Sequence, residues 1–300
     1  MPSRMDYKGI KFSPLEVEII MQIFHTIPEI RDFVRQARNG RRSVGLVPTM
    51  GCLHEGHLEL MRRAGEQCAV VVVSIFVNPA QFGPHEDFAN YPRDLERDVR
   101  MSGKAGVDAI FNPSVPEMYP EGFCTRVEVE RITEKLCGRS RPGHFSGVAT
   151  VVTKLFNIVK PDRAYFGQKD AQQALVIKRM AADLNLDLEV VTLPTVREPD
   201  GLAMSSRNRY LGSEERRAAV ILYKSLQHAK ELYRAGERDA AGLRRSVAAM
   251  IAAESLAAID YVEIYSYPEL EEVAEIRGPV LLALAVKIGR ARLIDNIVLE

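Results

Sequence analysis

The chain has 300 residues, of which 46% are hydrophobic and 7% aromatic, and it has no tryptophan. Such a chain can bury one large core or two moderate ones, which predicts a globular protein of one or two domains. The 40 lysines and arginines balance the 40 aspartates and glutamates. The overall charge therefore supplies no long-range field that would attract nucleic acid or an anionic membrane, although local basic pockets remain compatible with it.

The longest strongly apolar run, 69–77, is about half of the ~20 residues that a membrane-spanning helix needs, and it predicts a buried strand. The cysteines lack CxxC spacing, and charged residues stand at the N-terminus where a signal peptide has its apolar stretch. We therefore expect a cytoplasmic protein with no membrane or nucleic-acid partner. We also expect free thiols at all four cysteines: Cys52, Cys68, Cys124 and Cys137.

The first elements follow a stretch, residues 1–20, that has no clear place in a fold and that we interpret as a possible N-terminal extension. Met21 begins the first plausible strand. Thr26 and Glu29 have the spacing of a capping box, which predicts a helix through Arg38 that Gly40 ends.

Hydrophobic runs and helical patterns then alternate, which is typical of parallel strands joined by crossover helices. The predicted fold class is α/β, with a sheet order that the pattern does not reveal. The segment 112–147 is irregular and rich in proline and glycine, and its length suggests a functional excursion. The expected strands are 43–49, 69–77, 108–111, 163–166 and 188–192, and the expected helices are 58–67, 93–104, 148–159 and 171–184.

The pattern changes after the turn Pro199-Asp200-Gly201. Two amphipathic helices are expected, followed by three strands, which together predict a smaller α+β domain. We place the boundary near residue 196, giving domains 1–195 and 196–300. The expected helices are 213–234 and 238–253, and the expected strands are 258–265, 280–288 and 293–299.

The loop 50–57 lies between a predicted strand and a predicted helix, where backbone N–H groups and the helix dipole favour an anion. His54 and His57 are three residues apart, so both rings can face one side of the helix start and donate hydrogen bonds to phosphate oxygens. A helix start with ordinary polar residues is the alternative. Zinc binding of the H-E-x-x-H type is excluded because the spacing is one residue short.

A second candidate, 167–173, follows the strand 163–166, at the kind of strand end where doubly wound sheets bind ligands. Lys169 offers a positive charge for a phosphate, and Asp170 can help to hold Mg²⁺. The alternative is structural, since Asp170 and Gln173 also have the spacing of a capping box.

Three further loops supply polar groups at strand ends or at the domain boundary. The loop 203–208 has two hydroxyls and a guanidinium that can close over a triphosphate, Gln81 in 78–83 offers a donor and an acceptor to a small polar substrate, and 141–147 precedes a helix as another possible anion loop. Each is also readable as a plain turn or exposed loop. Taken together, the loops favour a nucleotide site. Cys52 has no evident base beside it, so a nucleophilic role is not expected.

Five segments carry a resemblance to a known family, in order and over the chain from about residue 21 to its end. They are Pro48-Thr-Met-Gly-Cys-Leu-His-Glu-Gly-His57, Phe76-Val-Asn-Pro-Ala-Gln-Phe-Gly83, Arg141-Pro-Gly-His-Phe-Ser-Gly147, Phe166-Gly-Gln-Lys-Asp-Ala-Gln-Gln173 and Met204-Ser-Ser-Arg-Asn208. They resemble the motifs of the pantoate:β-alanine ligase family. The first resembles the "HIGH" signature of the nucleotidyltransferase superfamily, and the last occupies the place of that superfamily's mobile "KMSKS" loop.

The resemblance implies a Rossmann-like N-terminal domain, a smaller C-terminal domain that acts as a lid, a homodimer, and Mg²⁺ with ATP as co-substrate. It implies a ligase that condenses (R)-pantoate with β-alanine in two steps. Pantoate first attacks the α-phosphorus of ATP to give pantoyl adenylate and pyrophosphate, and β-alanine then displaces AMP. This chemistry needs positioning and charge stabilisation more than a protein nucleophile.

The resemblance also implies residue roles. His57 would be the proton donor, Lys169 would contact phosphates, Val196 would contact adenine through its backbone, and Gln81 would meet β-alanine as well as pantoate. Cys52 departs from the small residue common at its position, which leaves a backbone role intact. Gln81 and Gln173 would bind pantoate, and no side-chain metal site is expected. The implied catalytic residues are His54, His57, Lys169, Ser205, Ser206 and Arg207. The implied ATP-binding residues are Met50, Gly51, Cys52, Leu53, His54, Glu55, Gly56, His57, Gly167, Gln168, Lys169, Asp170, Val196, Met204, Ser205, Ser206 and Arg207.

Two other classes remain as alternatives. A nucleotidyltransferase that adenylylates a phosphate acceptor would share the first loop but would not need Gln81 and Gln173 arranged for a hydroxy acid. A non-catalytic nucleotide- or RNA-binding module is the other, and the balanced charge and the lack of a basic-aromatic stripe argue against RNA.

Overall fold

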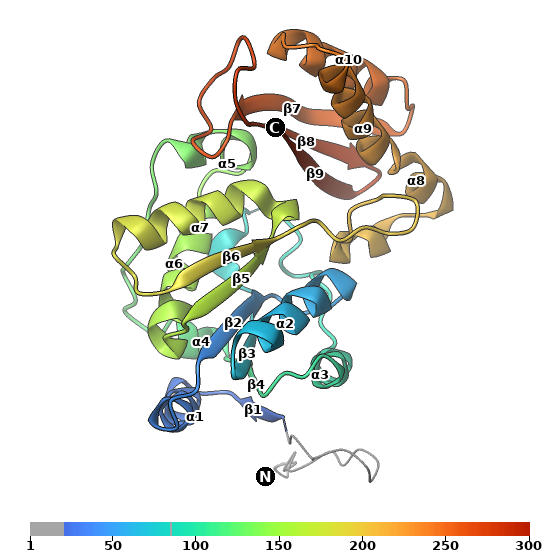
Figure 1. Cartoon of the computed structure of the whole chain (residues 1–300). Coiled ribbons are helices and arrows are strands. Elements are labelled where there is room, and N and C mark those ends of the chain that lie inside the picture. Colours follow the sequence, from blue (N-terminus) through green and yellow to red (C-terminus); the bar gives the residue numbers. More distant parts are fainter. Residues whose placement is uncertain (1–20, 85) are drawn as a thin grey trace.

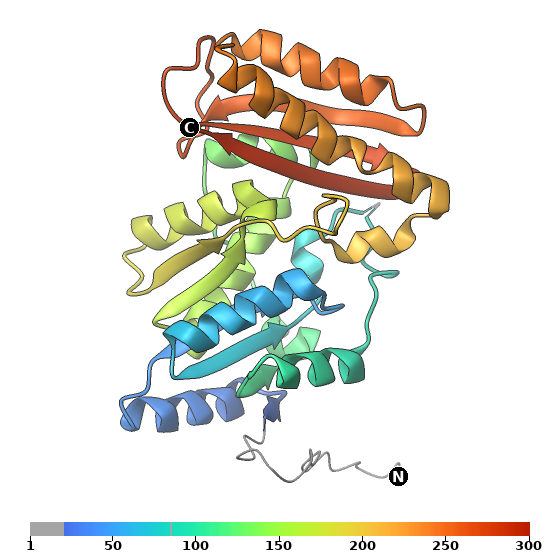
Figure 2. The same cartoon turned by 45° about the vertical axis from the view of Figure 1, so that its right-hand side comes forward.

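The computed structural model describes residues 21–84 and 86–300, so the N-terminal extension expected over 1–20 lies outside the described residues. Within them, a six-stranded parallel sheet lies below a three-stranded antiparallel sheet (Figure 1), and a turn of 45° shows the same two layers (Figure 2). The α/β fold class is confirmed. No helix in these ranges is both long enough and apolar enough to cross a membrane.

The larger sheet has the strand order β1-β4-β3-β2-β5-β6. Strands β2, β3 and β4 follow one another outward on one side, and β5 and β6 continue on the other, so the order reverses between β2 and β5. Open α/β sheets bind ligands outside the carboxyl ends of their strands at such a point. The strands are β1 (Gln22–Phe24), β2 (Val44–Thr49), β3 (Val70–Ile75), β4 (Ala109–Phe111), β5 (Arg163–Gly167) and β6 (Glu189–Leu193).

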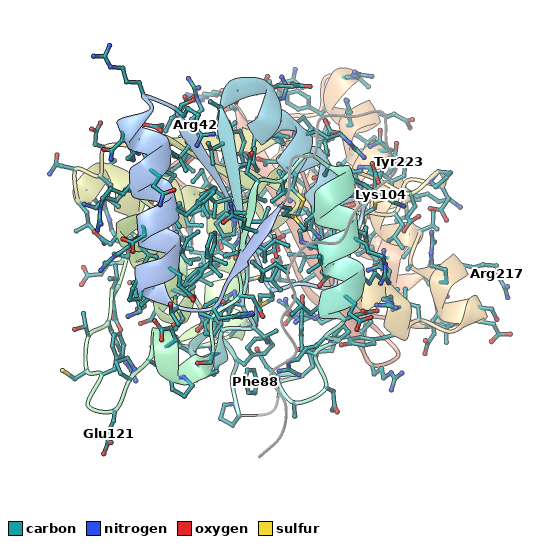
Figure 3. The ribbon with its side chains drawn as sticks, turned by 90° about the horizontal axis from the view of Figure 1, so that it is seen from below. Arg42, Phe88, Lys104, Glu121, Arg217 and Tyr223 are labelled. Carbon is teal, nitrogen blue, oxygen red and sulfur yellow. The ribbon has the colours of Figure 1, made fainter. Side chains whose placement is uncertain are left out.

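Helices cover both faces of this sheet. The apolar sides of α1, α6 and α7 pack with one set of strand residues, while α2 and α3 pack with the set that faces the other way. Seen from below in Figure 3, α1 and α3 flank the edge strand β1, and the exposed side chains of Arg42 and Lys104 lie on the outer surface. The helices are α1 (Ile27–Asn39), α2 (Glu55–Gln67), α3 (Leu95–Lys104), α4 (Val115–Met118), α5 (Leu136–Ser140), α6 (His144–Val159) and α7 (Ala171–Asp183).

The local signals at the first helix are confirmed. The hydroxyl of Thr26 accepts from the N–H of Glu29, and the Glu29 carboxylate accepts from the N–H of Thr26 at 3.0 Å. Gly40 is the C-cap. All four cysteines are free thiols, as expected.

The smaller sheet has the order β7-β8-β9, made by β7 (Ala257–Ser266), β8 (Val280–Ile288) and β9 (Ala291–Leu299). Its upper face packs against α9 (Ile221–Arg234) and α10 (Ala240–Ala252) through residues such as Leu282 and Leu284. The alternate residues Leu281, Ala283 and Ala285 belong to the core that also contains α6 and α7. Strand β8 is therefore buried on both faces, and the two sheets share a core.

One predicted helix is wrong in its extent. The expected helix 213–234 is two helices, α8 (Ser213–Ala218) and α9, because the chain tightens between them. There the N–H groups of Val220 and Leu222 donate three residues back, to Arg217 and Ala219, instead of four. This turn lets Ala219 and Leu222 both face the C-terminal core.

Smaller differences concern helix starts. Helix α2 begins at Glu55 instead of at residue 58, and α6 begins at His144 instead of at residue 148. In both cases a glycine-containing motif whose apolar pattern is weak forms the first helical turn. The irregular segment 112–147 contains the short helices α4 and α5.

Candidate active site

A cleft lies at the carboxyl ends of β2, β3, β5 and β6, at the point where the strand order reverses. Segments that are far apart in the sequence line it together. Of the residues singled out from the sequence, the lining includes Met50, His54, Gly56, His57, Gln81, Gly167, Lys169, Asp170, Gln173, Val196, Met204, Ser205, Ser206 and Arg207. The five motifs therefore contribute to one part of the molecule, four of them through the cleft wall itself.

Five of the singled-out residues do not line the cleft: Gly51, Cys52, Leu53, Glu55 and Gln168. Cys52 and Leu53 are buried behind it, where their N–H groups each donate to the carboxylate of Asp98 at 2.8 Å. The Glu55 carboxylate accepts from Arg62 on the exposed side of α2, and the Gln168 amide donates to Asn296.

The loop 50–57, which the sequence predicts to bind an anion, thus already binds a carboxylate of the protein itself, that of Asp98. Asp98, from α3, is 1% exposed, and its neighbour Arg97 donates to the carbonyl of Leu53 at 2.8 Å. Burial raises the pKa of Asp98, while the hydrogen bonds that it accepts from the N–H groups of Leu53 and Cys52 favour the charged form. Gly51 has a φ of +80°, and a Cβ there would lie 2.8 Å from Asp98 Oδ2. Nothing in the sequence around Asp98 signals this contact, because its partners are more than 40 residues away.

The rings of His54 and His57 pack against each other at the start of α2, with centroids 4.0 Å apart and planes tilted by 38°. The backbone N–H of His54 donates to His57 Nδ1 at 3.3 Å, which makes that nitrogen the acceptor and leaves Nε2 as the donor of a neutral ring. Burial, helped by the charge of Lys169, lowers the pKa of His54 to about 4. Burial and the neighbouring His54 lower the pKa of His57. Both rings are therefore neutral hydrogen-bond donors at pH 7.

Lys169 and Asp170 also line the cleft, from the turn between β5 and α7. The Lys169 ammonium is 3.5 Å from the Asp170 carboxylate. The sequence left open whether Asp170 caps α7, and its side chain makes no capping hydrogen bond. Both carboxylate and ammonium are instead available to the cleft, which Gln173 also lines from the first turn of α7.

Gln81 is held at its place by a network that the sequence did not reveal. Its side-chain oxygen accepts from Asn78 Nδ2 at 3.0 Å, and its amide donates to the sulfur of Met50. Asn78 is in turn fixed by the hydroxyl of Tyr119, which donates to Asn78 Oδ1 at 2.7 Å. The amide of Gln81 consequently has a defined orientation toward the cleft.

The segment 141–147 supports Gln81 and is not an anion loop in this structure. The Arg141 guanidinium donates to both carboxylate oxygens of Glu86 at 2.6 Å, which satisfies it internally. His144 Nδ1 contacts the carbonyl of Gln81 at 2.9 Å. Gly147 has no room for a side chain, since a Cβ there would lie 2.2 Å from the Ala80 carbonyl oxygen.

The loop 204–207 also lines the cleft. Arg207 donates to the Asp87 carboxylate at 3.0 Å, and the hydroxyls of Ser206 and Tyr91 are 3.3 Å apart. Ser205 accepts from the N–H of Arg207. These contacts tie the loop to the segment 87–91, which sequence reasoning did not include in the site.

The fold and this cleft define the class of protein: a Rossmann-like α/β enzyme with a polar site at the switch point of its sheet. The model of the family described as "Pantoate-beta-alanine ligase" matches residues 22–298. The chain belongs to the pantoate-β-alanine ligase family.

Relatives and solved structures agree with this family. The chain is 73% identical over 279 residues to the pantothenate synthetase of Pelotomaculum thermopropionicum, covering 93% of this chain and 99% of the relative. It is 60% identical over 280 residues to that of Moorella thermoacetica, with 93% and 99% coverage. A crystal structure of pantothenate synthetase from Thermus thermophilus superposes with a TM-score of 0.88 at 47% identity, covering 92% of this chain and 99% of the other.

A further solved structure carries ligands. It is the pantoate-β-alanine ligase of Francisella tularensis in complex with "Beta-gamma ATP" and β-alanine, which superposes with a TM-score of 0.76 at 35% identity and covers 92% of this chain and 97% of the other. The chain is therefore an enzyme of the ligase class that forms a carbon–nitrogen bond.

The neutral imidazoles predict a pH dependence of folding stability. An unfolded histidine has a pKa near 6.5. Burial lowers the pKa of both His54 and His144 to about 4 in the folded protein. The unfolded state binds more protons in this window, so the free energy of unfolding should fall as the pH is lowered from about 6.5 to 4. Urea denaturation across this range measures the slope.

The variant His54→Asn should make that slope shallower, because it removes one of the groups responsible. An unchanged slope in His54→Asn would show that His54 titrates alike in the folded and unfolded states.

Proposed function

We propose that the protein catalyses the ATP-dependent condensation of (R)-pantoate with β-alanine to pantothenate through a pantoyl adenylate, releasing AMP and pyrophosphate. The observation that carries this proposal is the set of side chains that line the cleft. Phosphate-directed donors (His54, His57 and Lys169) and two glutamine amides (Gln81 and Gln173) line one cleft. The site is thus equipped to place a hydroxy acid against a triphosphate.

The phosphate end fits adenylyl transfer. Negative charge accumulates on the pyrophosphate as it leaves, and neutral N–H donors with one compact ammonium stabilise that charge at the start of a helix. His57 would donate its Nε2 hydrogen to the leaving group, with Nδ1 fixed by the backbone of His54. Cys52, the cysteine of the same loop, is 2% exposed and outside the lining, so we assign no covalent intermediate to it.

The two glutamine amides fit pantoate. A primary amide pairs with a carboxylate or hydroxyl oxygen through its N–H groups and with a hydroxyl hydrogen through its oxygen, and both glutamines offer this pair. Apolar side chains of α6, among them Val148 and Val151, line the cleft and match the two methyl groups of pantoate. Gln81 would also meet the incoming amine of β-alanine.

We infer the nucleotide contacts from the same lining. Gly56 and Gly167 allow close approach of the backbone to ATP, and Val196 would contact adenine through its backbone. Arg207 would leave Asp87 and turn to the triphosphate when the loop 204–207 closes. The hydroxyls of Ser205 and Ser206 would then donate to the same phosphates.

Mg²⁺ would enter as the partner of ATP. Among the described residues, no cluster of three or more histidine, cysteine, aspartate or glutamate side chains can hold a metal ion. Two carboxylates line the cleft, those of Asp170 and Glu59, and Glu59 is paired with Arg62. We therefore assign Asp170, since one carboxylate with substrate phosphates suits Mg²⁺. The ion would neutralise phosphate charge while Lys169 orients the chain of phosphates.

We further propose a cytoplasmic homodimer in which residues 1–195 form the nucleotide- and pantoate-binding domain and 196–300 the lid. The resemblance of the motifs supports these assignments. A nucleotidyltransferase acting on a phosphate acceptor is disfavoured, because it would not need the amides of Gln81 and Gln173 in the lining of the cleft.

The order of chemistry predicts an isotope exchange. With Mg²⁺, ATP, pantoate and labelled pyrophosphate, but without β-alanine, the protein should transfer label into ATP, because the first step is reversible without the amine. A phosphorylated-pantoate mechanism would release ADP and show no exchange. Pantothenate formation without pantoate-dependent exchange would contradict the adenylate intermediate.

Removal of a phosphate donor should slow that exchange. His54→Ala and His57→Ala should each lower its kcat by roughly 10²-fold or more, the scale of losing one preorganised charge-stabilising donor. His25→Ala, at an exposed histidine outside the cleft, is the matched control. Near-normal turnover in both variants would refute the phosphate role of this loop.

Loss of a glutamine amide should weaken pantoate binding selectively. Gln81→Leu and Gln173→Leu leave substrate hydroxyl or carboxylate groups unpaired, so the KM for pantoate should rise by at least about tenfold while the KM for ATP changes little. Gln36→Leu, at an exposed glutamine of α1, is the control. A selective rise in the KM for ATP would contradict the assignment.

A further inference from the structure

The last strand of the chain reaches the site from outside the cleft. Asp295 and Asn296 are neighbours in β9, at the edge of the smaller sheet, and they are 2% and 5% exposed. Neither residue lines the cleft. The Asn296 side chain contacts the turn between β5 and α7, and the Asp295 side chain contacts Arg197, which follows Val196, as well as the N–H of Asn296. The turn and Val196 both contribute to the lining of the cleft.

Asn296 holds the turn that carries Lys169. Both hydrogens of its amide are used: Nδ2 donates to the carbonyl of Gln168 and to that of Lys169, each at 2.9 Å. Its Oδ1 accepts from the side-chain amide of Gln168 at 3.2 Å. One buried side chain thus makes three hydrogen bonds to two consecutive residues of the short turn that begins at the end of β5, and an amide is the group that supplies two donors and an acceptor at once.

Asp295 holds the segment that follows Val196. Its carboxylate accepts from both terminal nitrogens of Arg197, at 2.6 and 2.9 Å. Such a paired geometry fixes orientation as well as distance. Arg197 also lies over the ring of Tyr223 and donates to the carbonyl of Gly201, so the pair anchors the whole turn 197–201.

We propose that Asn296 and Asp295 are positioning residues for the first half-reaction, with Asn296 setting the place of Lys169 and Asp295 that of the backbone at Val196. Lys169 needs this support because its own side-chain contact, 3.5 Å to Asp170, is a loose one. The smaller sheet thereby contributes to phosphate binding without touching the substrate. This inference rests on the function proposed above.

Its test is the pantoate-dependent exchange between ATP and pyrophosphate in the full-length protein. Asn296→Ala frees the turn, and misplacement of a catalytic group by about 1 Å costs up to 10²-fold in rate. The kcat of exchange should therefore fall about 10- to 100-fold, while the KM for pantoate changes less than about threefold. Asn296→Asp, which keeps the shape but removes both donors, should show the same loss.

A double-mutant cycle separates positioning from general damage. If Asn296 acts through Lys169, then Asn296→Ala should add less than about a twofold further loss in a Lys169→Ala background. Independent, multiplying losses would overturn the proposal. So would exchange at the parent's rate in both Asn296 variants.

Leu299→Ala is the matched control for stability, since Leu299 is a buried core residue of the same strand that contacts neither Gln168 nor Lys169 through a hydrogen bond. It should lower Tm and leave kcat near that of the parent, and an equal loss of exchange in Leu299→Ala would assign the effect to stability and refute positioning. If Asn296→Ala does not fold, the cycle is run with Asn296→Asp. Absence of exchange in the parent protein would instead refute the proposed function.

Discussion

The buried carboxylate of Asp98 is the contact on which the geometry of the site depends. A charged group that is 1% exposed is stable only where donors surround it, and here the donors are the backbone N–H groups of Cys52 and Leu53. The same bonds impose the path of the loop that ends at His54. The loop is therefore shaped by a residue of α3 before any substrate arrives, and the helix that follows begins with its imidazoles already directed into the cleft.

Few charges in the rest of the site are left without a close partner. Two arginines close to it, Arg141 and Arg207, are paired with Glu86 and Asp87, and the two histidines are uncharged. Lys169 is thus the cation of the lining with the weakest internal partner, at 3.5 Å. A cleft organised in this way attracts a polyanion through directed hydrogen bonds and a single strong charge, which favours defined placement over general affinity.

Much of the fold and of the cleft lining was predictable from the sequence, because the sequence signals for them are local. The capping box at Thr26 depends on residues three apart, and the α/β class depends on alternating patterns that reflect burial. The lining motifs were found because each is a short segment at the end of a strand or at the domain boundary. The roles of Asp98, Asn78 and Asn296 were not predictable, since each acts on a partner brought close only by the fold. The break after Ala218 was missed because both halves continue one amphipathic pattern.

Strand β8 has no solvent face, since Leu282 and Leu284 pack upward while Leu281 and Ala283 pack into the core of the larger layer. A strand with this position belongs to both layers at once. Neither layer can lose its order without exposing apolar surface of the other, so the described chain is expected to melt as one cooperative unit despite its two sheets. The backbone amides of β8 are accordingly placed among the slowest to exchange their hydrogens with water, because only global opening uncovers them.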